Sequence, residues 1–239
     1  MEGVITTDNA SRAHIYCLNS GNHVYSKIES TTSLILTRKN NMIVDPSTKY
    51  SREKIIMGLK SLGLHPKDID TVVLTHYHLD HVANYGMFKN ARFFIHDNDL
   101  KTLGSLTGTL TLAVLKAIMR EFDFSIGDFV DRLKPISKLK TYRSLNVLET
   151  FGHTGGSISL CVSGQKRIVI SGDALTRMSF AKEFSIQSQN GNNATDLYSR
   201  SFAKVIESGE IIVPGHDKPF MKSVDGYIHL DIGVDLASV

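Results

Sequence analysis

Cysteine is scarce in this 239-residue chain, which contains only two. Cys17 and Cys161 lie far apart among apolar neighbours, without the close spacing of a thiolate metal site or a redox pair. This usage argues against a cysteine-based zinc site and against a disulfide framework. We interpret both cysteines as buried free thiols and expect a reducing, cytoplasmic location.

Long apolar runs and a strong charge surplus are also absent. No run reaches the roughly 18 apolar residues that a spanning helix needs, and the N-terminus lacks the basic-then-apolar pattern of a signal peptide. We therefore expect no membrane segment and no membrane partner. The net charge of +3 and the pI near 8.7 are compatible with anionic substrates but too weak to indicate nucleic-acid binding.

Repeats, low-complexity tracts and Pro/Gly-rich linkers are missing as well, so nothing in the sequence marks a domain boundary. A content of 41% hydrophobic and 21% charged residues is typical of a globular protein that can build a full core. We predict one domain over residues 1–239.

The apolar pattern predicts a mixed α/β chain in which short strands dominate. Strands are expected at 14–18, 24–28, 33–37, 41–45, 71–74, 91–95, 145–150, 158–162, 167–171 and 210–213. Helices are expected from Ser51 to Gly63, at 82–88, at 112–122, and at 197–206 after a cap by Thr195 or Asp196. Residues 97–142 form the least regular part, an insertion that either covers a binding site or only packs.

One short run has an unusual density of metal-binding side chains. His76, His78, Asp80 and His81 follow the β-branched stretch 71–74, which reads as a buried strand. Imidazole and carboxylate suit zinc, iron or manganese. Burying so many polar groups without an ion would be costly, so the run predicts a metal site where a strand emerges.

The same sequence pattern recurs along the chain: an apolar strand ends, a turn follows, and a His or Asp comes next. It recurs at Asp45, His153, Asp173 and His216. Strand ends from distant segments can converge on one edge of a layered β structure. The His-rich run and the last three of these positions together contain five His and two Asp. Seven ligands are too many for one tetrahedral zinc and about right for two ions.

These motifs, in this order, resemble those of the metallo-β-lactamase superfamily, over roughly residues 14–222. The resemblance implies a four-layer αββα sandwich of the α/β (α+β) class, with metals at one edge. It also implies ligand roles, with a bridge by Asp173, a first metal held by His76, His78 and His153, and a second held by Asp80, His81 and His216. Asp45 would orient a ligand or hold the loop.

The chemistry expected of such a site is hydrolysis. Two divalent ions, most simply zinc but with iron or manganese possible, share one water and lower its pKa, so that a metal-bridging hydroxide attacks a carbonyl or phosphorus. Asp80 is the candidate catalytic residue, orienting the nucleophile and passing its proton to the leaving group. No Ser-His-Asp or Cys-His arrangement is visible.

Differences from other members of the superfamily narrow the expected class of substrate. Asp173 stands where many antibiotic-hydrolysing members have Cys, and only a short tail follows His216, unlike glyoxalase II-like enzymes. Lactonases remain similar, although the Tyr that they use has no clear counterpart, since Tyr77 lies inside the ligand run. Small metallo-β-lactamase-domain proteins related to a histone-mRNA endonuclease are also similar, at 84–88 and 214–220.

We therefore predict a small-molecule ester, lactone or thioester as substrate, with a homodimer possible. RNA is the alternative, for which the candidate contacts are Arg177, Lys182, Lys218 and Lys222. An iron-dependent persulfide dioxygenase and a metal-binding scaffold without turnover are further alternatives. His23, on a turn-rich loop, is a candidate substrate contact. The remaining histidines, His14, His65, His96 and His229, are interpreted as structural or surface residues.

Overall fold

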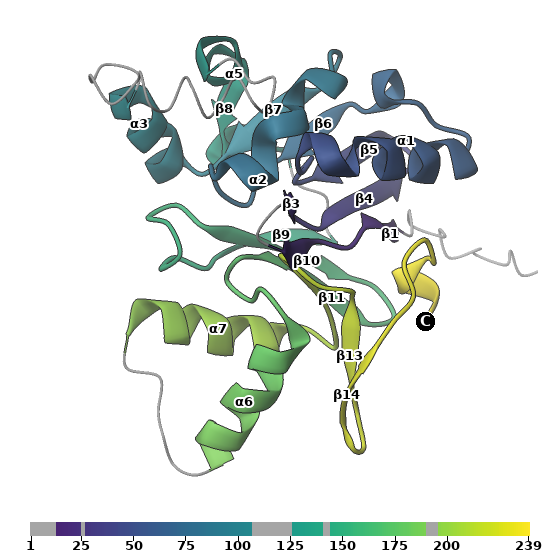
Figure 1. Cartoon of the computed structure of the whole chain (residues 1–239), viewed down its shortest axis with the longest axis vertical. Helices are drawn as coiled ribbons and strands as arrows, with labels where there is room; N and C mark the ends of the chain where they lie inside the picture. Colours follow the sequence, from purple (N-terminus) through teal and green to yellow (C-terminus); the bar gives the residue numbers. More distant parts are fainter. Residues whose placement is uncertain (1–12, 25–26, 107–125, 141–143, 190–195) are drawn as a thin grey trace, which may run out of the picture.

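The computed structural model describes residues 13–24, 27–106, 126–140, 144–189 and 196–239 (Figure 1). Within these residues the chain forms two six-stranded sheets and a separate two-stranded pair. The described helices cover the outer faces of the two sheets, so the layers run helix, sheet, sheet, helix (Figure 1). The prediction of an αββα sandwich is confirmed.

The first sheet has the strand order β1-β4-β5-β6-β7-β8 and the second the order β14-β13-β12-β11-β10-β9. The first comprises β1 (His14–Asn19), β4 (Thr32–Thr37), β5 (Asn40–Val44), β6 (Thr71–Val73), β7 (Arg92–Ile95) and β8 (Leu133–Pro135). The second comprises β9 (Leu145–Glu149), β10 (Ile158–Ser163), β11 (Arg167–Gly172), β12 (Ile211–Pro214), β13 (Phe220–Ser223) and β14 (Gly226–His229). The small pair is β2 (Asn22–Val24) with β3 (Lys27–Glu29).

The helices divide between the two outer faces. Those packed on the first sheet are α1 (Arg52–Ser61), α2 (Leu79–Val82), α3 (Asp97–Leu106) and α5 (Ile126–Arg132). Those packed on the second sheet are α6 (Met178–Gln189) and α7 (Leu197–Ser208). No helix of the described part of the chain is long and apolar enough to cross a membrane.

The central strands are apolar on both faces because each face is covered. In β11, Ile168 and Ile170 point between the sheets, whereas Val169 packs against α6 and α7. In β12, Val213 faces the inner core and Ile212 the outer one. Such two-sided burial explains why these strands read as continuous apolar runs rather than as an alternation.

Several elements depart from the sequence prediction. Segment 24–28, predicted as one strand, is divided between β2 and β3, which pair with each other antiparallel. Segment 82–88, predicted as a helix, is a 3₁₀ segment, Ala83–Met87, after a short α2 that begins inside the His-rich run. The helix predicted at 112–122 lies outside the described residues. Helices α3, α5 and α6 and the strands β8, β13 and β14 were not predicted.

Candidate metal centre

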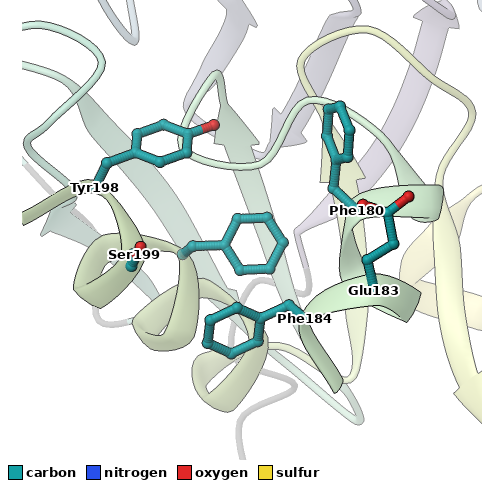
Figure 2. A pocket seen from close by; sticks show the side chains of 6 residues that line it. Phe180, Glu183, Phe184, Tyr198 and Ser199 are labelled. Carbon is teal, nitrogen blue, oxygen red and sulfur yellow. The ribbon is translucent and has the colours of Figure 1, made fainter. Parts of the chain in front are cut away.

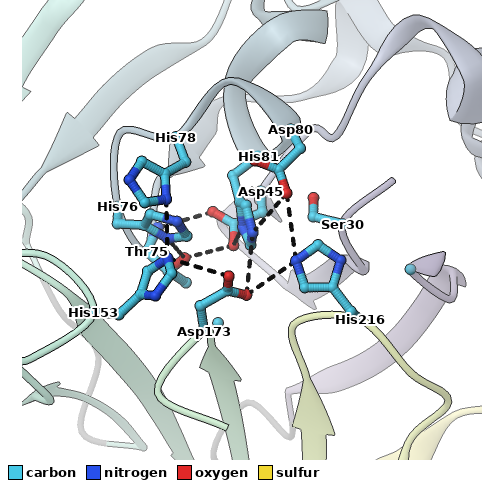
Figure 3. A network of polar contacts seen from close by, with 12 residues as sticks. Ser30, Asp45, Thr75, His76, His78, Asp80, His81, His153, Asp173 and His216 are labelled. Carbon is cyan, nitrogen blue, oxygen red and sulfur yellow. Dashed lines mark hydrogen bonds and ion pairs between the residues drawn. The ribbon is translucent and has the colours of Figure 1, made fainter. Parts of the chain in front are cut away.

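The predicted ligands converge at one edge of the sandwich, where main-chain hydrogen bonds join the two sheets. Ile158 N, at the start of β10, donates to the carbonyl of Thr75 (2.9 Å), and Thr31 N donates to the carbonyl of Gly215 (2.7 Å). The seven side chains that meet here are His76, His78, Asp80 and His81 after β6, His153 between β9 and β10, Asp173 after β11, and His216 after β12 (Figure 3).

Three imidazoles form one group. One nitrogen each from His76, His78 and His153 lies within 4.8 Å of the others. The shortest separation is 2.9 Å, between His78 Nδ1 and His153 Nε2. Three imidazole nitrogens directed at one point make a typical ligand set for a zinc-like ion.

A second group consists of Asp80, His81 and His216. Oδ2 of Asp80 is 3.3 Å from His216 Nε2 and 3.6 Å from His81 Nε2. The side chain of Asp80 is 24% exposed, whereas those of the two histidines are fully buried. Asp80 is therefore the member of this group that faces incoming molecules.

Asp173 lies between the two groups. Its Oδ2 is 3.3 Å from His153 Nε2, in the first group. Its Oδ1 is 3.2 Å from His81 Nε2 and 3.3 Å from His216 Nε2, in the second. One carboxylate oxygen for each group is the arrangement that a bridging ligand requires.

The outer nitrogens of two buried imidazoles are held by acceptors. His81 Nδ1–H donates to Asp45 Oδ2 (2.8 Å), and His216 Nδ1–H donates to the carbonyl of Glu29 (2.9 Å). With Nδ1 occupied in this way, the Nε2 of each ring is the atom that can carry a lone pair into the site. Such a bond also makes the inner nitrogen a more basic ligand.

A relay through Thr75 fixes the third buried imidazole. The Thr75 hydroxyl donates its single proton to Asp45 Oδ2 (2.6 Å), so its oxygen accepts from His76 Nδ1–H (3.1 Å). His76 Nε2 is therefore also left with its lone pair directed inward. One carboxylate, Asp45, thus orients an imidazole of each group, directly for His81 and through a hydroxyl for His76.

Asp45 also contacts the loop after β6, and its own backbone is strained. It has φ +52°, Ser47 has φ +59°, and no other non-glycine residue of the described chain has a positive φ. Its Oδ1 accepts from Thr75 N (2.8 Å). Ser47 N donates to the carbonyl of His81 (3.0 Å), and Asn84 Nδ2 donates to that of Pro46 (3.0 Å). Both predicted roles of Asp45, orienting a ligand and holding the loop, therefore have a geometric basis.

The site also contains buried atoms that a cation would satisfy. Among the described residues, His76 Nε2, His81 Nε2 and Asp173 Oδ1 are buried and make no hydrogen bond. Leaving such atoms unsatisfied costs free energy. All three are donor atoms suited to divalent ions, and they lie within 4.8 Å of one another. The residues present therefore fit bound metal.

The charges of the site are strongly coupled. Burial opposes a charge on His81, but Asp173, Asp45 and Asp80 outweigh it and raise its pKa well above 6.5. Burial likewise opposes a charge on Asp173, but His81 and the other imidazoles lower its pKa well below 3.8. Burial and the nearby imidazoles, His81 foremost, lower the pKa of His76. A cation would take the place of the proton on His81.

Two glycines permit the close approach of these loops. Gly172 has φ +50°, and a Cβ there would collide with the side chain of Thr75. A Cβ on Gly215 would collide with Asp173 Oδ1. Gly172 stands directly before Asp173 in the sequence and Gly215 directly before His216, so the turn that presents each predicted ligand depends on the missing side chain.

Helix α3, which was not predicted, holds the loop that carries His153. Asp99 is fully buried, and its Oδ2 accepts from the Thr154 hydroxyl (2.9 Å). Asn98 Nδ2 donates to the carbonyl of Gly155 (3.0 Å). Burial raises the pKa of the Asp99 carboxyl. No local sequence signal points to these contacts, because the paired residues are 55 and 57 positions apart in the sequence.

Tyr198, on the first turn of α7, was also missed. Its hydroxyl donates to the main-chain carbonyl of Asp173 (3.2 Å), and burial raises its pKa. The first turn of α7 packs so closely on the His153 loop that a Cβ on Gly152 would overlap the Tyr198 backbone. Tyr77, by contrast, packs against the core on the outer face of the first sheet.

The other residues predicted to contact a substrate are not among these seven side chains. Lys182, Lys218 and Lys222 are exposed and Arg177 is half-buried. His23 lies in β2, with a side chain outside the described part of the chain.

Four other histidines remain apart from the seven converging side chains. His14 pairs with Asp235 (2.7 Å) and His65 with Asp68 (3.4 Å). The other two are His96 and His229, whose Nε2 atoms lie 3.8 Å from Glu149 and Asp217.

An αββα sandwich with His and Asp side chains gathered at one sheet edge defines the class of metallo-β-lactamase-like proteins. The model of the metallo-beta-lactamase superfamily matches residues 28–216, and the chain belongs to this superfamily.

Particular relatives extend the family match. A probable metallo-hydrolase of Methanocaldococcus jannaschii is 37% identical over 133 residues, which are 56% of this chain and 50% of that protein. Metallo-beta-lactamase domain-containing protein 1 of Xenopus laevis is 29% identical over 181 residues, 75% of this chain and 67% of that protein. The chain thus spans half to two thirds of the length of these relatives.

A lactonase and a solved structure are also similar. The N-acyl homoserine lactonase of a Bacillus species is 23% identical over 168 residues, 69% of this chain and 62% of that protein. The crystal structure of a probable metal-dependent hydrolase from Staphylococcus aureus superposes with a TM-score of 0.63, at 18% identity, over 92% of this chain and 97% of that one. The structural likeness concerns the fold.

Proposed function

We propose that the chain is a dinuclear metal-dependent hydrolase, acting on a small-molecule ester, lactone or thioester. The observation that carries the proposal is the placement of Asp173, with one oxygen facing each ligand group. His76, His78 and His153 would hold one ion, Asp80, His81 and His216 the other, and Asp173 both. Zinc suits this donor set best, and a cytoplasmic location accords with the two free, buried thiols.

When bound, two such ions polarise a substrate carbonyl and lower the pKa of a shared water towards neutrality, which supplies a hydroxide nucleophile at pH 7. The chain itself supplies orientation. Asp45 and Glu29 keep the Nε2 atoms of His81 and His216 directed inward. Asp80, the more exposed of the two site carboxylates, is placed to take the proton of the attacking water and to pass it to the leaving oxygen or sulfur.

One relative and the surface of the site support this substrate class. The lactonase relative hydrolyses a cyclic ester, as its name states. Three of the four basic residues considered for RNA, Lys182, Lys218 and Lys222, are exposed. Exposed lysines scattered over a surface are ordinary solvated groups.

The test is a substrate panel on metal-loaded protein: a phenyl ester, a γ-lactone, an acyl thioester, a phosphodiester reporter and RNA. We expect turnover of at least one carbonyl substrate and its loss, by about 10³-fold or more, in His153→Ala and Asp173→Asn. His65→Ala, which removes an exposed histidine away from the site, is the matched control. Turnover of RNA or the phosphodiester alone would contradict the proposed substrate class.

A further inference from the structure

A pocket next to the metal centre is not used by the mechanism above. It lies between α6 and α7, has a volume of about 360 Å³, and is lined by aromatic side chains (Figure 2). Phe184 and Phe202 form its inner wall, with ring centroids 4.8 Å apart. Tyr198 and Phe180 stand on either side in Figure 2. This volume is within the range of small-molecule sites, roughly 300–1,000 Å³.

Both helices that enclose the pocket are fastened to ligand loops. Met178 N, the first residue of α6, donates to Asp217 Oδ2 (3.1 Å), directly beside His216. On α7, the Tyr198 hydroxyl donates to the carbonyl of Asp173 (3.2 Å), and the Ser201 hydroxyl donates to that of Phe151 (2.6 Å). Each helix that encloses the pocket is therefore tied by hydrogen bonds to a loop that carries a predicted metal ligand.

The lining indicates an uncharged, apolar occupant. Four of the six lining residues are aromatic, and one of them, Phe180, is 45% exposed and so accessible to a ligand in the pocket. Glu183 is the charged residue among the six that line the pocket, and none of the six is Lys or Arg. A negative rim repels phosphate or carboxylate groups and leaves apolar groups unaffected.

The position of Asp80 decides which part of a substrate enters the pocket. The leaving group must lie within reach of Asp80, which neighbours His216 Nε2 at 3.3 Å. Tyr198 adjoins Asp173 and the His153 loop instead. We take the retained acyl group to lie on the side of Tyr198, because the leaving group must lie at Asp80 and Tyr198, which lines the pocket, contacts Asp173 rather than Asp80.

We propose that the pocket between α6 and α7 binds the neutral, medium-length acyl chain or aryl acyl group of the substrate. This inference rests on the proposed function and specifies its substrate class. In the reaction, water adds to the acyl carbon and the bond from that carbon to the leaving oxygen breaks. The products are the carboxylic acid, which retains the pocket-bound chain, and the alcohol, which takes up a proton.

The experiment uses metal-loaded protein and p-nitrophenyl acetate, butyrate and octanoate, which share one leaving group. We expect kcat/KM to rise by at least tenfold from acetate to octanoate, because each buried methylene contributes up to about fourfold. Phe180→Ala should lower the octanoate-to-acetate ratio at least fivefold. Leu197→Ala removes a 56% exposed apolar side chain on the same helix pair, outside the lining, and should leave the ratio unchanged.

Replacing Glu183 by Lys tests the effect of the negative charge at the edge of the pocket. Glu183→Lys should raise kcat/KM for the mono-p-nitrophenyl ester of suberic acid, whose chain ends in a carboxylate, relative to the octanoate ester. Equal ratios in wild type, Phe180→Ala and Leu197→Ala, or an unchanged preference in Glu183→Lys, would overturn the inference. Circular dichroism of each variant checks that the fold is retained.

Binding of octanamide to metal-free protein, measured by calorimetry, separates this inference from the proposed function. Binding that weakens in Phe180→Ala, without turnover of any ester, would support the pocket and contradict the hydrolase. Turnover independent of chain length, without octanamide binding, would support the hydrolase and contradict the pocket.

Discussion

Replacing Asp45 by Asn tests how the site is held together. The Asp45 carboxylate accepts three hydrogen bonds, from Thr75 N (2.8 Å), the Thr75 hydroxyl (2.6 Å) and His81 Nδ1 (2.8 Å). Two of them end on Oδ2, where the amide of Asn would present N–H groups to two donors. The positive φ of the position is tolerated by Asn, so the backbone should survive the change.

The magnitude follows from the lost bonds. A hydrogen bond to a charged group contributes about 1.5–3 kcal/mol, so loss of the His81 contact alone should weaken metal binding by roughly 10- to 100-fold. Because Thr75 relays the same carboxylate to His76, the first group is affected as well. Competition titrations with a chromophoric chelator, resolved into two binding steps, measure both effects.

Thr75→Val separates the direct contact of Asp45 with His81 from its indirect contact with His76 through the Thr75 hydroxyl. This variant keeps the Asp45–His81 bond and removes only the hydroxyl that holds His76 Nδ1. It should weaken one binding step and leave the other close to wild type, whereas Asp45→Asn weakens both. Wild-type affinity in both steps of Asp45→Asn would refute the claim that this carboxylate orients the ligands.

Three further predictions concern packing, thiol reactivity and pH. In thermal unfolding, Gly172→Ala should lower the free energy of unfolding by about 2–4 kcal/mol, because the new Cβ overlaps the Thr75 side chain and φ is +50°. The control Gly63→Ala, with φ +74° and open space around the new Cβ, should lower it by only about 1 kcal/mol. Cys17 is 1% exposed and burial raises its pKa to about 12, so iodoacetamide labelling read by mass spectrometry should find it unmodified in native protein at pH 8 and modified in denaturant; labelling of native protein would contradict this burial. Nearby carboxylates raise the pKa of His81 well above 6.5, so a proton competes with the metal below that raised pKa. The affinity measured by competition titration should therefore increase as the pH rises above 6.5, and an affinity that falls with pH would contradict the ligand assignment.

The convergence of the seven His and Asp side chains could be predicted because the sequence signal for each is local. Each follows an apolar strand directly, and a strand end fixes where the next residues point, so His153, Asp173 and His216 were candidates from the pattern alone. The fold class followed from the same alternation of strands and helices, together with the resemblance of the motifs to a known family.

The supporting contacts could not be predicted because they join segments that only the folded sheets bring together. Asn98 reaches the carbonyl of Gly155, and the Tyr198 hydroxyl reaches that of Asp173, across long stretches of sequence. Strands β13 and β14 were missed because most of their side chains are exposed, which leaves little apolar periodicity to detect. Helix α6 was missed although Met178, Ala181 and Phe184 have helical spacing and pack on the second sheet.

In the proposed function, seven side chains hold two cations through one shared carboxylate. Elemental analysis of purified, metal-saturated protein tests it most directly, beside Asp173→Asn and the distant control Asp225→Asn. We expect about two ions per chain in wild type and in Asp225→Asn, and one or fewer in folded Asp173→Asn. Two ions in folded Asp173→Asn, or no more than one in wild type, would contradict it.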